Sequence, residues 1–96
     1  MAAAQRIEVH FAGRVQGVGF RHTTTLVARD FDVTGFVQNL TDGRVRLVAE
    51  GEPDELKRFV AAIDQRMSGL IRETLVDRRA ATGEFTRFAV KYSTNH

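Results

Sequence analysis

The stretch with the clearest capacity for chemistry covers residues 13–21 and reads Gly-Arg-Val-Gln-Gly-Val-Gly-Phe-Arg. Its glycines allow the backbone to turn sharply and to bring its N–H groups close to a ligand. A helix is predicted to begin where the stretch ends, and a helix N-terminus carries free N–H groups and a partial positive charge. Arg21 adds a planar guanidinium, which suits oxyanions. We therefore expect this stretch to bind a phosphate or a carboxylate.

The composition is that of a globular protein with one small core. The chain has 96 residues, of which 43% are hydrophobic and 27% are charged, so we expect a single domain over residues 1–96 with an ordered core from about residue 6 to about residue 92. The net charge of +2 is too small to argue for a nucleic-acid partner, although the positive residues are mainly arginine. Without cysteine there is no disulfide or thiolate metal site. No apolar run is long enough to cross a bilayer, and the expected location is the cytoplasm.

The apolar pattern predicts the order β-α-β-β-α-β-β. Apolar and polar residues alternate in the strands, and the second helix has a clear apolar stripe that begins after Pro53. An Asp42-Gly43 pair predicts a hairpin turn between the second and third strands. The predicted strands cover residues 6–11, 34–40, 44–50, 71–79 (a short one) and 88–92, and the predicted helices cover residues 22–32 and 53–67.

This order is typical of an α+β fold, the ferredoxin-like α/β sandwich, in which two helices cover one face of an antiparallel sheet of four or five strands. The first two strands are joined through a helix and are expected to run in the same direction. Their C-terminal ends then lie at one edge of the sheet. We therefore expect Asn39, near the end of the second strand, to lie close to Arg21.

Two separate stretches resemble the signatures of the acylphosphatase family. Residues 13–21 resemble the first signature, G-x-V-Q-G-V-x-F-R, and residues 35–45 resemble the second, with Asn39 and Gly43 in the matching places. The resemblance extends from Ile7 to Tyr92. It is weaker in two loops, where the family often has Leu-Gly or a proline and this chain reads Asp30-Phe31-Asp32-Val33 and Met67-Ser68-Gly69-Leu70.

The resemblance implies a small enzyme that hydrolyses the carboxyl–phosphate bond of acyl phosphates to a carboxylate and inorganic phosphate, with no metal and no cofactor. It implies that Arg21 and Asn39 are the catalytic residues and that Asn39 positions a water. It implies phosphate binding by Val15, Gln16, Gly17, Val18, Gly19, Phe20 and Arg21. The expected partners are a small acyl phosphate and phosphate, with no nucleic acid and no membrane, and the expected state is a monomer.

The residue types agree with this chemistry. No nucleophile with a partner base and no cluster of metal ligands is evident in the sequence. An enzyme without these groups needs a substrate with a good leaving group. A carboxylate, with a pKa of about 4, leaves without being protonated. An amide such as Asn39 accepts no proton near neutral pH, but it can orient a water by accepting a hydrogen bond from it. The proton of the water would go to an oxygen of the substrate's own phosphate.

Other interpretations stay open at this stage. The glycine stretch could be a plain strand-to-helix turn, and Asn39 a turn residue bonded to its own backbone. An RNA-binding module would need exposed aromatic residues on the central strands, and residues 45–49 have none. An anion sensor would keep Arg21 but would not need Asn39. Carbamoyl-phosphate chemistry is a further possibility, as in larger proteins with a similar domain. We expect Phe20 to be a core anchor, Thr24 to support the loop or pack, and His22 to be solvated.

Overall fold

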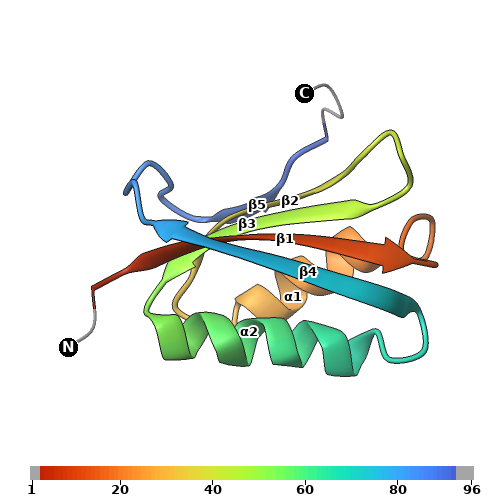
Figure 1. Ribbon diagram of the computed structural model, residues 1–96, viewed down its shortest axis with the longest axis horizontal. Coiled ribbons are helices and arrows are strands. Elements are labelled where there is room, and N and C mark those ends of the chain that lie inside the picture. The colour runs from red at the N-terminus through yellow and green to blue at the C-terminus, as the bar shows by residue number, and fades with distance from the viewer. Residues whose placement is uncertain (1–2, 93–96) are drawn as a thin grey trace.

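The computed structural model describes residues 3–92 and contains one sheet and two helices (Figure 1). Both helices lie below the sheet in the view of Figure 1. Along the chain the elements are β1 (Gln5–Gly13), α1 (Phe20–Ala28), β2 (Thr34–Asn39), β3 (Val45–Gly51), α2 (Pro53–Arg66), β4 (Ile71–Ala80) and β5 (Phe88–Val90). No helix in the described part of the chain is long and apolar enough to span a membrane.

The strand order is β4-β1-β3-β2-β5, which is the predicted ferredoxin-like α+β architecture. β3 lies between β1 and β2 and is antiparallel to both, so β1 and β2 run in the same direction. Their C-terminal ends therefore meet at one end of the sheet, as predicted. In Figure 1 the loop after β1 and the β2–β3 hairpin both lie at that end, on the right. The sheet is mixed rather than wholly antiparallel, because β5 pairs with β2 in the parallel direction.

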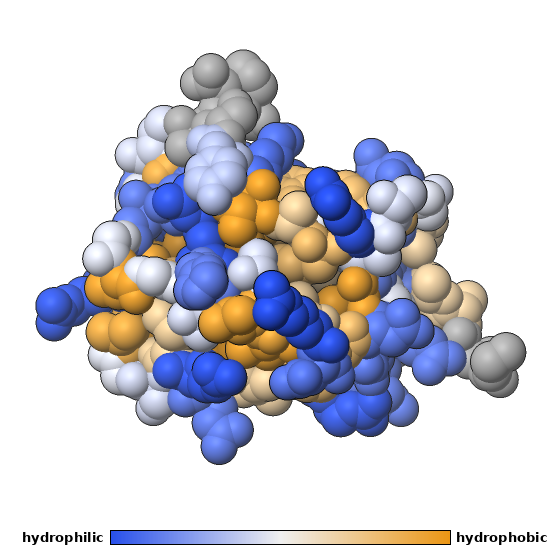
Figure 2. Space-filling view, turned by 180° about the vertical axis from the view of Figure 1, so that it is seen from behind, coloured by the Kyte–Doolittle hydropathy of each residue, from blue (hydrophilic) through white to orange (hydrophobic). Residues whose placement is uncertain are grey.

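The core lies between the sheet and the two helices. Every second residue of β1 is buried, beginning with Ile7, and these side chains meet the apolar stripe of α2. Phe59 is the aromatic centre of this layer, since its ring lies 5.7 Å from that of Phe31 and 5.5 Å from that of Phe88. Some apolar surface stays uncovered, and Figure 2 shows separate hydrophobic areas (orange) among hydrophilic residues (blue).

The first helix differs from its predicted bounds of 22–32 and covers Phe20–Ala28. It begins earlier because Gly19, in the left-handed conformation with φ 77°, serves as the N-cap and allows Phe20 to enter the helix. It ends earlier because the chain tightens into a turn, with Asp30 N–H donating to the Val27 carbonyl. The Asp32 N–H then donates to Glu55 of α2 at 2.8 Å, which draws this turn toward the second helix.

The last two strands also differ from prediction. The segment predicted as a strand over 71–79 is β4, which extends one residue further to Ala80 and pairs along the whole of the nine-residue β1. Its residues are mostly exposed, so the apolar alternation that normally marks a strand is weak here. The strand predicted over 88–92 ends at Val90. Residues 93–96, predicted to be a polar tail, lie outside the described residues.

The loop 81–87 crosses from β4 to β5 and contacts Glu50 of β3, which is 5% exposed. The Glu50 carboxylate accepts hydrogen bonds from the backbone N–H of Thr82 and of Gly83, both at 2.9 Å, and from the Thr82 hydroxyl at 3.0 Å. Burial raises the pKa of Glu50, but these hydrogen bonds together with the Arg6 charge outweigh it and hold the pKa below its usual value. The ionised carboxylate thus fastens the loop to the sheet.

We predict that Glu50→Gln lowers the free energy of unfolding by about 1–3 kcal/mol near pH 7, because an amide cannot accept all three hydrogen bonds. A carboxylate with a depressed folded-state pKa stabilises the fold above its unfolded pKa, and this contribution is lost as the pH falls through the folded pKa. The difference between wild type and variant is therefore expected to be largest near neutrality and to shrink in acid. Urea unfolding across this range measures it, and a difference that does not change with pH would contradict the assignment.

Candidate active site

Residues 14–19 form the loop between β1 and α1, and two contacts and one backbone conformation fix its shape. At its start, the Arg14 N–H donates to the Leu70 carbonyl at 2.8 Å. Gly17 adopts φ 75°, a left-handed conformation that costs other residues about 1–2 kcal/mol. At its end, the side chain of Phe20 is buried with its ring 5.1 Å from Phe11. Phe20 is therefore the anchor that the sequence predicts, and Thr24 supports it by donating its hydroxyl to the Phe20 carbonyl at 2.9 Å.

The backbone N–H groups of this loop are unused. Within residues 3–92, none of the N–H groups from Val15 to His22 donates a hydrogen bond to another residue. The first turn of α1 holds no acidic side chain, so nothing there neutralises the partial positive charge of the helix N-terminus. Free donors on a backbone that curves around one point form an anion-binding concavity.

Arg21 adds a full positive charge at the mouth of the loop. Its guanidinium makes no ion pair or hydrogen bond with any described residue. Its one recorded contact is with Tyr92, whose ring centroid lies 5.2 Å from the guanidinium carbon. The planar donors of Arg21 therefore remain free for an oxyanion.

Asn39 is the last residue of β2, at the same end of the sheet. The hairpin that follows is closed by the Leu40 N–H, which donates to the Arg44 carbonyl at 2.8 Å. The Oδ1 atom of Asn39 is buried and accepts no hydrogen bond from the described residues. A buried acceptor without a donor costs about 1–3 kcal/mol, so this atom favours a donor that is not part of the protein.

Gln16 joins the loop to the hairpin. Its side-chain Nε2 donates to the Leu40 carbonyl at 2.7 Å and to the Arg44 carbonyl at 2.9 Å. The two acceptors lie on either side of the hairpin turn, one residue beyond β2 and one residue before β3. This amide group therefore ties the loop with the free N–H groups to the hairpin that follows Asn39. The sequence predicts Gln16 only as a backbone donor, and no local pattern indicates where its side chain points.

The loop, Arg21 and Asn39 border one cavity of about 200 Å³. Six of the residues predicted for the site line it, whereas Gln16 and Val18 do not, since Gln16 turns to the hairpin and Val18 is 38% exposed. Three further residues complete the lining, namely His22, Val90 and Tyr92. His22 is exposed, as the sequence predicts, but it borders the cavity. The residues that line it are Val15, Gly17, Gly19, Phe20, Arg21, His22, Asn39, Val90 and Tyr92.

Within the described residues, no three His, Asp or Glu side chains lie close enough together to hold a metal ion. The carboxylate of the β2–β3 hairpin at this end of the sheet is engaged elsewhere. Asp42 accepts from the backbone N–H and the side chain of Arg44, and these bonds lower its pKa. The cavity is therefore lined by donors, one amide acceptor and apolar groups, without an acidic side chain.

A ferredoxin-like sheet with a glycine-containing loop of unused N–H groups after its first strand defines a recognisable class of small protein, and comparisons with known proteins place the chain within it. The acylphosphatase family model matches residues 7–90. An acylphosphatase from Methylococcus capsulatus is 47% identical over 88 residues, which cover 90% of this chain and 95% of that protein. The chain belongs to the acylphosphatase family, and the enzyme predicted from its sequence is confirmed at that level.

Solved structures agree with this assignment. The crystal structure of acylphosphatase from Bacillus subtilis superposes with a TM-score of 0.84 at 31% identity and covers 92% of this chain and 99% of that one. Full-length HypF, solved in a phosphate- and nucleotide-bound form, matches with a TM-score of 0.83 at 25% identity. This second match covers 95% of this chain but only 12% of HypF.

We predict that Gln16→Leu lowers kcat for an acyl phosphate about tenfold or more, because a hairpin that is no longer tied to the loop misplaces Asn39. The inhibition constant of inorganic phosphate is expected to change much less, since the N–H groups from Val15 to His22 are still present. Steady-state kinetics with phosphate as inhibitor separate the two effects. Gln65→Leu, on the exposed side of α2, is the matched control. Equal losses in turnover and in phosphate binding would show that the variant damages the loop itself.

Proposed function

We propose that this enzyme hydrolyses the carboxyl–phosphate bond of small acyl phosphates without a metal ion. In this proposal the backbone N–H groups from Val15 to Phe20 and the Arg21 guanidinium hold the phosphoryl group, and Asn39 positions the attacking water. The observation that carries it is that residues with unused backbone donors, the unpaired Arg21 and Asn39 with its unused buried acceptor all line a single cavity. All of these groups come from one chain, so a monomer has the complete site.

Phosphate binding follows from charge-assisted hydrogen bonds. Each such bond is worth about 1.5–3 kcal/mol, and the N-terminus of α1 contributes about 0.3–1 kcal/mol more. The donors are fixed by the backbone before the substrate arrives, so no reorganisation is needed when charge develops on the phosphoryl oxygens. The planar fork of Arg21 can bind two of these oxygens at once. Binding and stabilisation of the transition state therefore come from the same groups.

The water is the second reactant. Asn39 Oδ1 accepts a hydrogen bond from it and holds it for attack on phosphorus, which is a contribution of position rather than of basicity. As the bond from the water oxygen to phosphorus forms, the bond from phosphorus to the acyl oxygen breaks, and its electron pair leaves with the carboxylate. The proton of the water passes to a phosphoryl oxygen. The products are a carboxylate and inorganic phosphate.

The leaving group of the substrate explains why the proposed mechanism needs no general acid. A carboxylate with a pKa of about 4 departs without a proton, whereas an alkoxide needs a general acid. A phosphate monoester is therefore expected to be a poor substrate. An anion sensor would use the same donors, but the free acceptor of Asn39 has no role in binding a dianion and favours hydrolysis.

The direct test is to incubate the purified chain with acetyl phosphate in the presence of excess EDTA and to measure release of inorganic phosphate. We expect hydrolysis at the same rate with and without the chelator, competitive inhibition by phosphate, and negligible release from a simple phosphate monoester. Loss of activity in EDTA would refute metal independence. Phosphate binding without any turnover would favour an anion sensor.

We predict that Arg21→Lys lowers kcat/KM by about 10²-fold or more, because a single ammonium cannot reproduce the bidentate geometry of the guanidinium. Phosphate is also expected to inhibit this variant more weakly. Arg29→Lys, at the exposed C-terminal end of the same helix, is the matched control. It shows the effect of replacing an arginine with lysine outside the cavity. An Arg21→Lys variant with wild-type kcat/KM would remove Arg21 from the proposed mechanism.

We predict that Asn39→Ala lowers kcat by about 10²-fold and leaves the inhibition constant of phosphate nearly unchanged, because the side chain positions water and not the phosphoryl group. Single-turnover kinetics and phosphate inhibition measure the two quantities. Thr41→Ala, in the exposed hairpin turn two residues later, controls for a disturbed turn. Full turnover by Asn39→Ala would show that the water is held by other groups.

A further inference from the structure

β4 leaves one edge of the sheet unpaired. It is the outermost strand in the order β4-β1-β3-β2-β5, and among residues 3–92 only the edge that faces β1 has a partner strand. The strand is ten residues long and contains no proline, so its free edge offers a continuous row of backbone donors and acceptors. Two apolar side chains at its middle stay open to solvent, Leu75 at 51% and Val76 at 45% exposure. Such an edge is suited to pair with a strand of another chain.

A groove of about 260 Å³ lies beside this edge, between β4 and α2, which passes below the strand in Figure 1. Its inner wall is apolar and includes Ile7 and Leu56 of the core. Val76 also lines the groove, because it pairs with the buried Val9 of β1 and its side chain therefore points to the helix side of the sheet. A neighbour that covered the groove would remove apolar surface from water.

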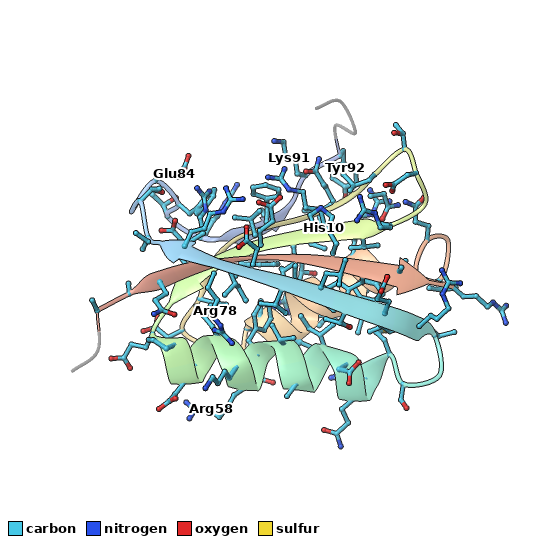
Figure 3. All side chains as sticks on the ribbon, in the orientation of Figure 1. His10, Arg58, Arg78, Glu84, Lys91 and Tyr92 are labelled. Atoms are coloured by element: carbon cyan, nitrogen blue, oxygen red, sulfur yellow. The ribbon has the colours of Figure 1, made fainter. Side chains whose placement is uncertain are left out.

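Three charged side chains border the groove, Lys57 and Asp64 from α2 and Arg78 from β4. Figure 3 shows Arg78 between the strand and the helix. None of the three forms an ion pair or a side-chain hydrogen bond with another residue that the structure describes. Lys57 and Asp64 lie on the same face of α2, two turns and about 10 Å apart, which is too far for them to pair with each other. Their charges are therefore available to a neighbouring molecule.

We propose that β4 and this face of α2 form an interface at which two copies of the chain make a dimer. A two-fold axis perpendicular to the sheet brings the two β4 strands side by side and antiparallel, which joins the sheets and keeps all four helices on one side. The dimer does not depend on the proposed function, and each copy retains its complete cavity, since no residue that lines it belongs to β4 or α2. The sequence predicts a monomer, because this strand edge and these charges meet only in the fold.

The charges on the two helices favour a second copy as the occupant of the groove. The groove is lined by the middle of both elements, within residues 74–78 of β4 and 57–64 of α2, so one axis passes near the centre of each. Because the copies are antiparallel, Lys57 lies across the joined grooves from the partner's Asp64, and Asp64 from the partner's Lys57. The small side chain of Ala61, between these two charges, leaves the grooves open to the two Val76 side chains. Opposite charges therefore face each other twice, which favours association and fixes its orientation.

The strands offer a register that agrees with this axis. If the pairing is centred on Val76, Glu73 lies opposite the partner's Arg79 on the open face of the sheet, and the same pair recurs on the other side of the axis. If the pairing is centred on Leu75 instead, Glu73 lies opposite the partner's Asp77, and like charges directly opposite each other destabilise a sheet. We therefore expect the register centred on Val76, with the two Val76 side chains in contact above the joined grooves.

The test is sedimentation equilibrium over protein concentrations from about 1 µM to about 1 mM, which measures the dissociation constant of the dimer. Wild type is expected to associate reversibly into a dimer. Val76→Lys places two ammonium groups at the axis and is expected to raise the dissociation constant about 100-fold or more. Lys57→Glu is expected to raise it about tenfold, and the double variant Lys57→Glu/Asp64→Lys, which exchanges the two charges, is expected to restore it. Arg66→Glu, exposed on the same helix but outside the groove, is the matched control.

A wild-type chain that stays a monomer over this range refutes the proposal. A dimer whose dissociation constant is the same in Val76→Lys refutes it as well, because its interface then lies elsewhere. A double variant that associates no better than Lys57→Glu refutes the pairing of Lys57 with the partner's Asp64 on which the proposal rests. Weaker association in Val76→Lys and Lys57→Glu, with restoration in the double variant and no change in Arg66→Glu, supports it. Thermal unfolding of each variant checks that the fold is retained.

Discussion

The site depends on backbone N–H groups that the protein leaves unpaired. A buried donor without an acceptor would destabilise the fold, so groups of this kind need contact with solvent when no ligand is bound. The structure meets this requirement at Gly17, Val18 and Gly19, which are exposed, whereas Val15 and Phe20 on either side of them are buried. Phe20 is fixed in the core, and Arg14 is fixed by its hydrogen bond to Leu70. The loop is thus open at its centre and rigid at its ends.

The sheet topology brings Asn39, which is not part of this loop, to the same cavity. Because β3 separates β1 from β2 and is antiparallel to both, the two strands end at the same place, and Asn39 comes to the cavity without any long connection. Gln16 then ties the loop to the hairpin through its two bonds. The parallel pairing of β5 with β2 brings a third segment to the same end. Residues from three different segments therefore border one cavity at this end of the sheet.

Much of this arrangement is predictable from the sequence because it follows from local rules. The glycines and Arg21 indicate the anion site, the alternation of apolar residues indicates β1 to β3, and the chain order indicates the topology that brings Asn39 to Arg21. The bounds of α1 were not predictable to the residue, because Gly19 as an N-cap has no side chain to mark the helix start. The strand β4 extends one residue beyond its predicted bounds of 71–79, and its pattern is weak because its pairing with β1 depends on backbone hydrogen bonds and not on an apolar face.

Two contributors to the site could not be found by sequence reasoning. The role of the Gln16 side chain depends on carbonyl groups 24 and 28 residues away. The position of Tyr92 depends on the register between β5 and β2, and the sequence predicted that residue only as the end of a strand. In both cases the information lies in long-range geometry, which neither periodicity nor a motif encodes.

The most direct test of the central claim is to titrate the ¹⁵N-labelled chain with inorganic phosphate and to follow its amide resonances, with chloride at matched ionic strength as the control. The account predicts saturable shifts that are largest at the N–H groups from Val15 to His22 and at the Arg21 side chain, and that are absent with chloride. Shifts of equal size spread over the surface arginines, or a loop that does not respond to phosphate, would contradict it.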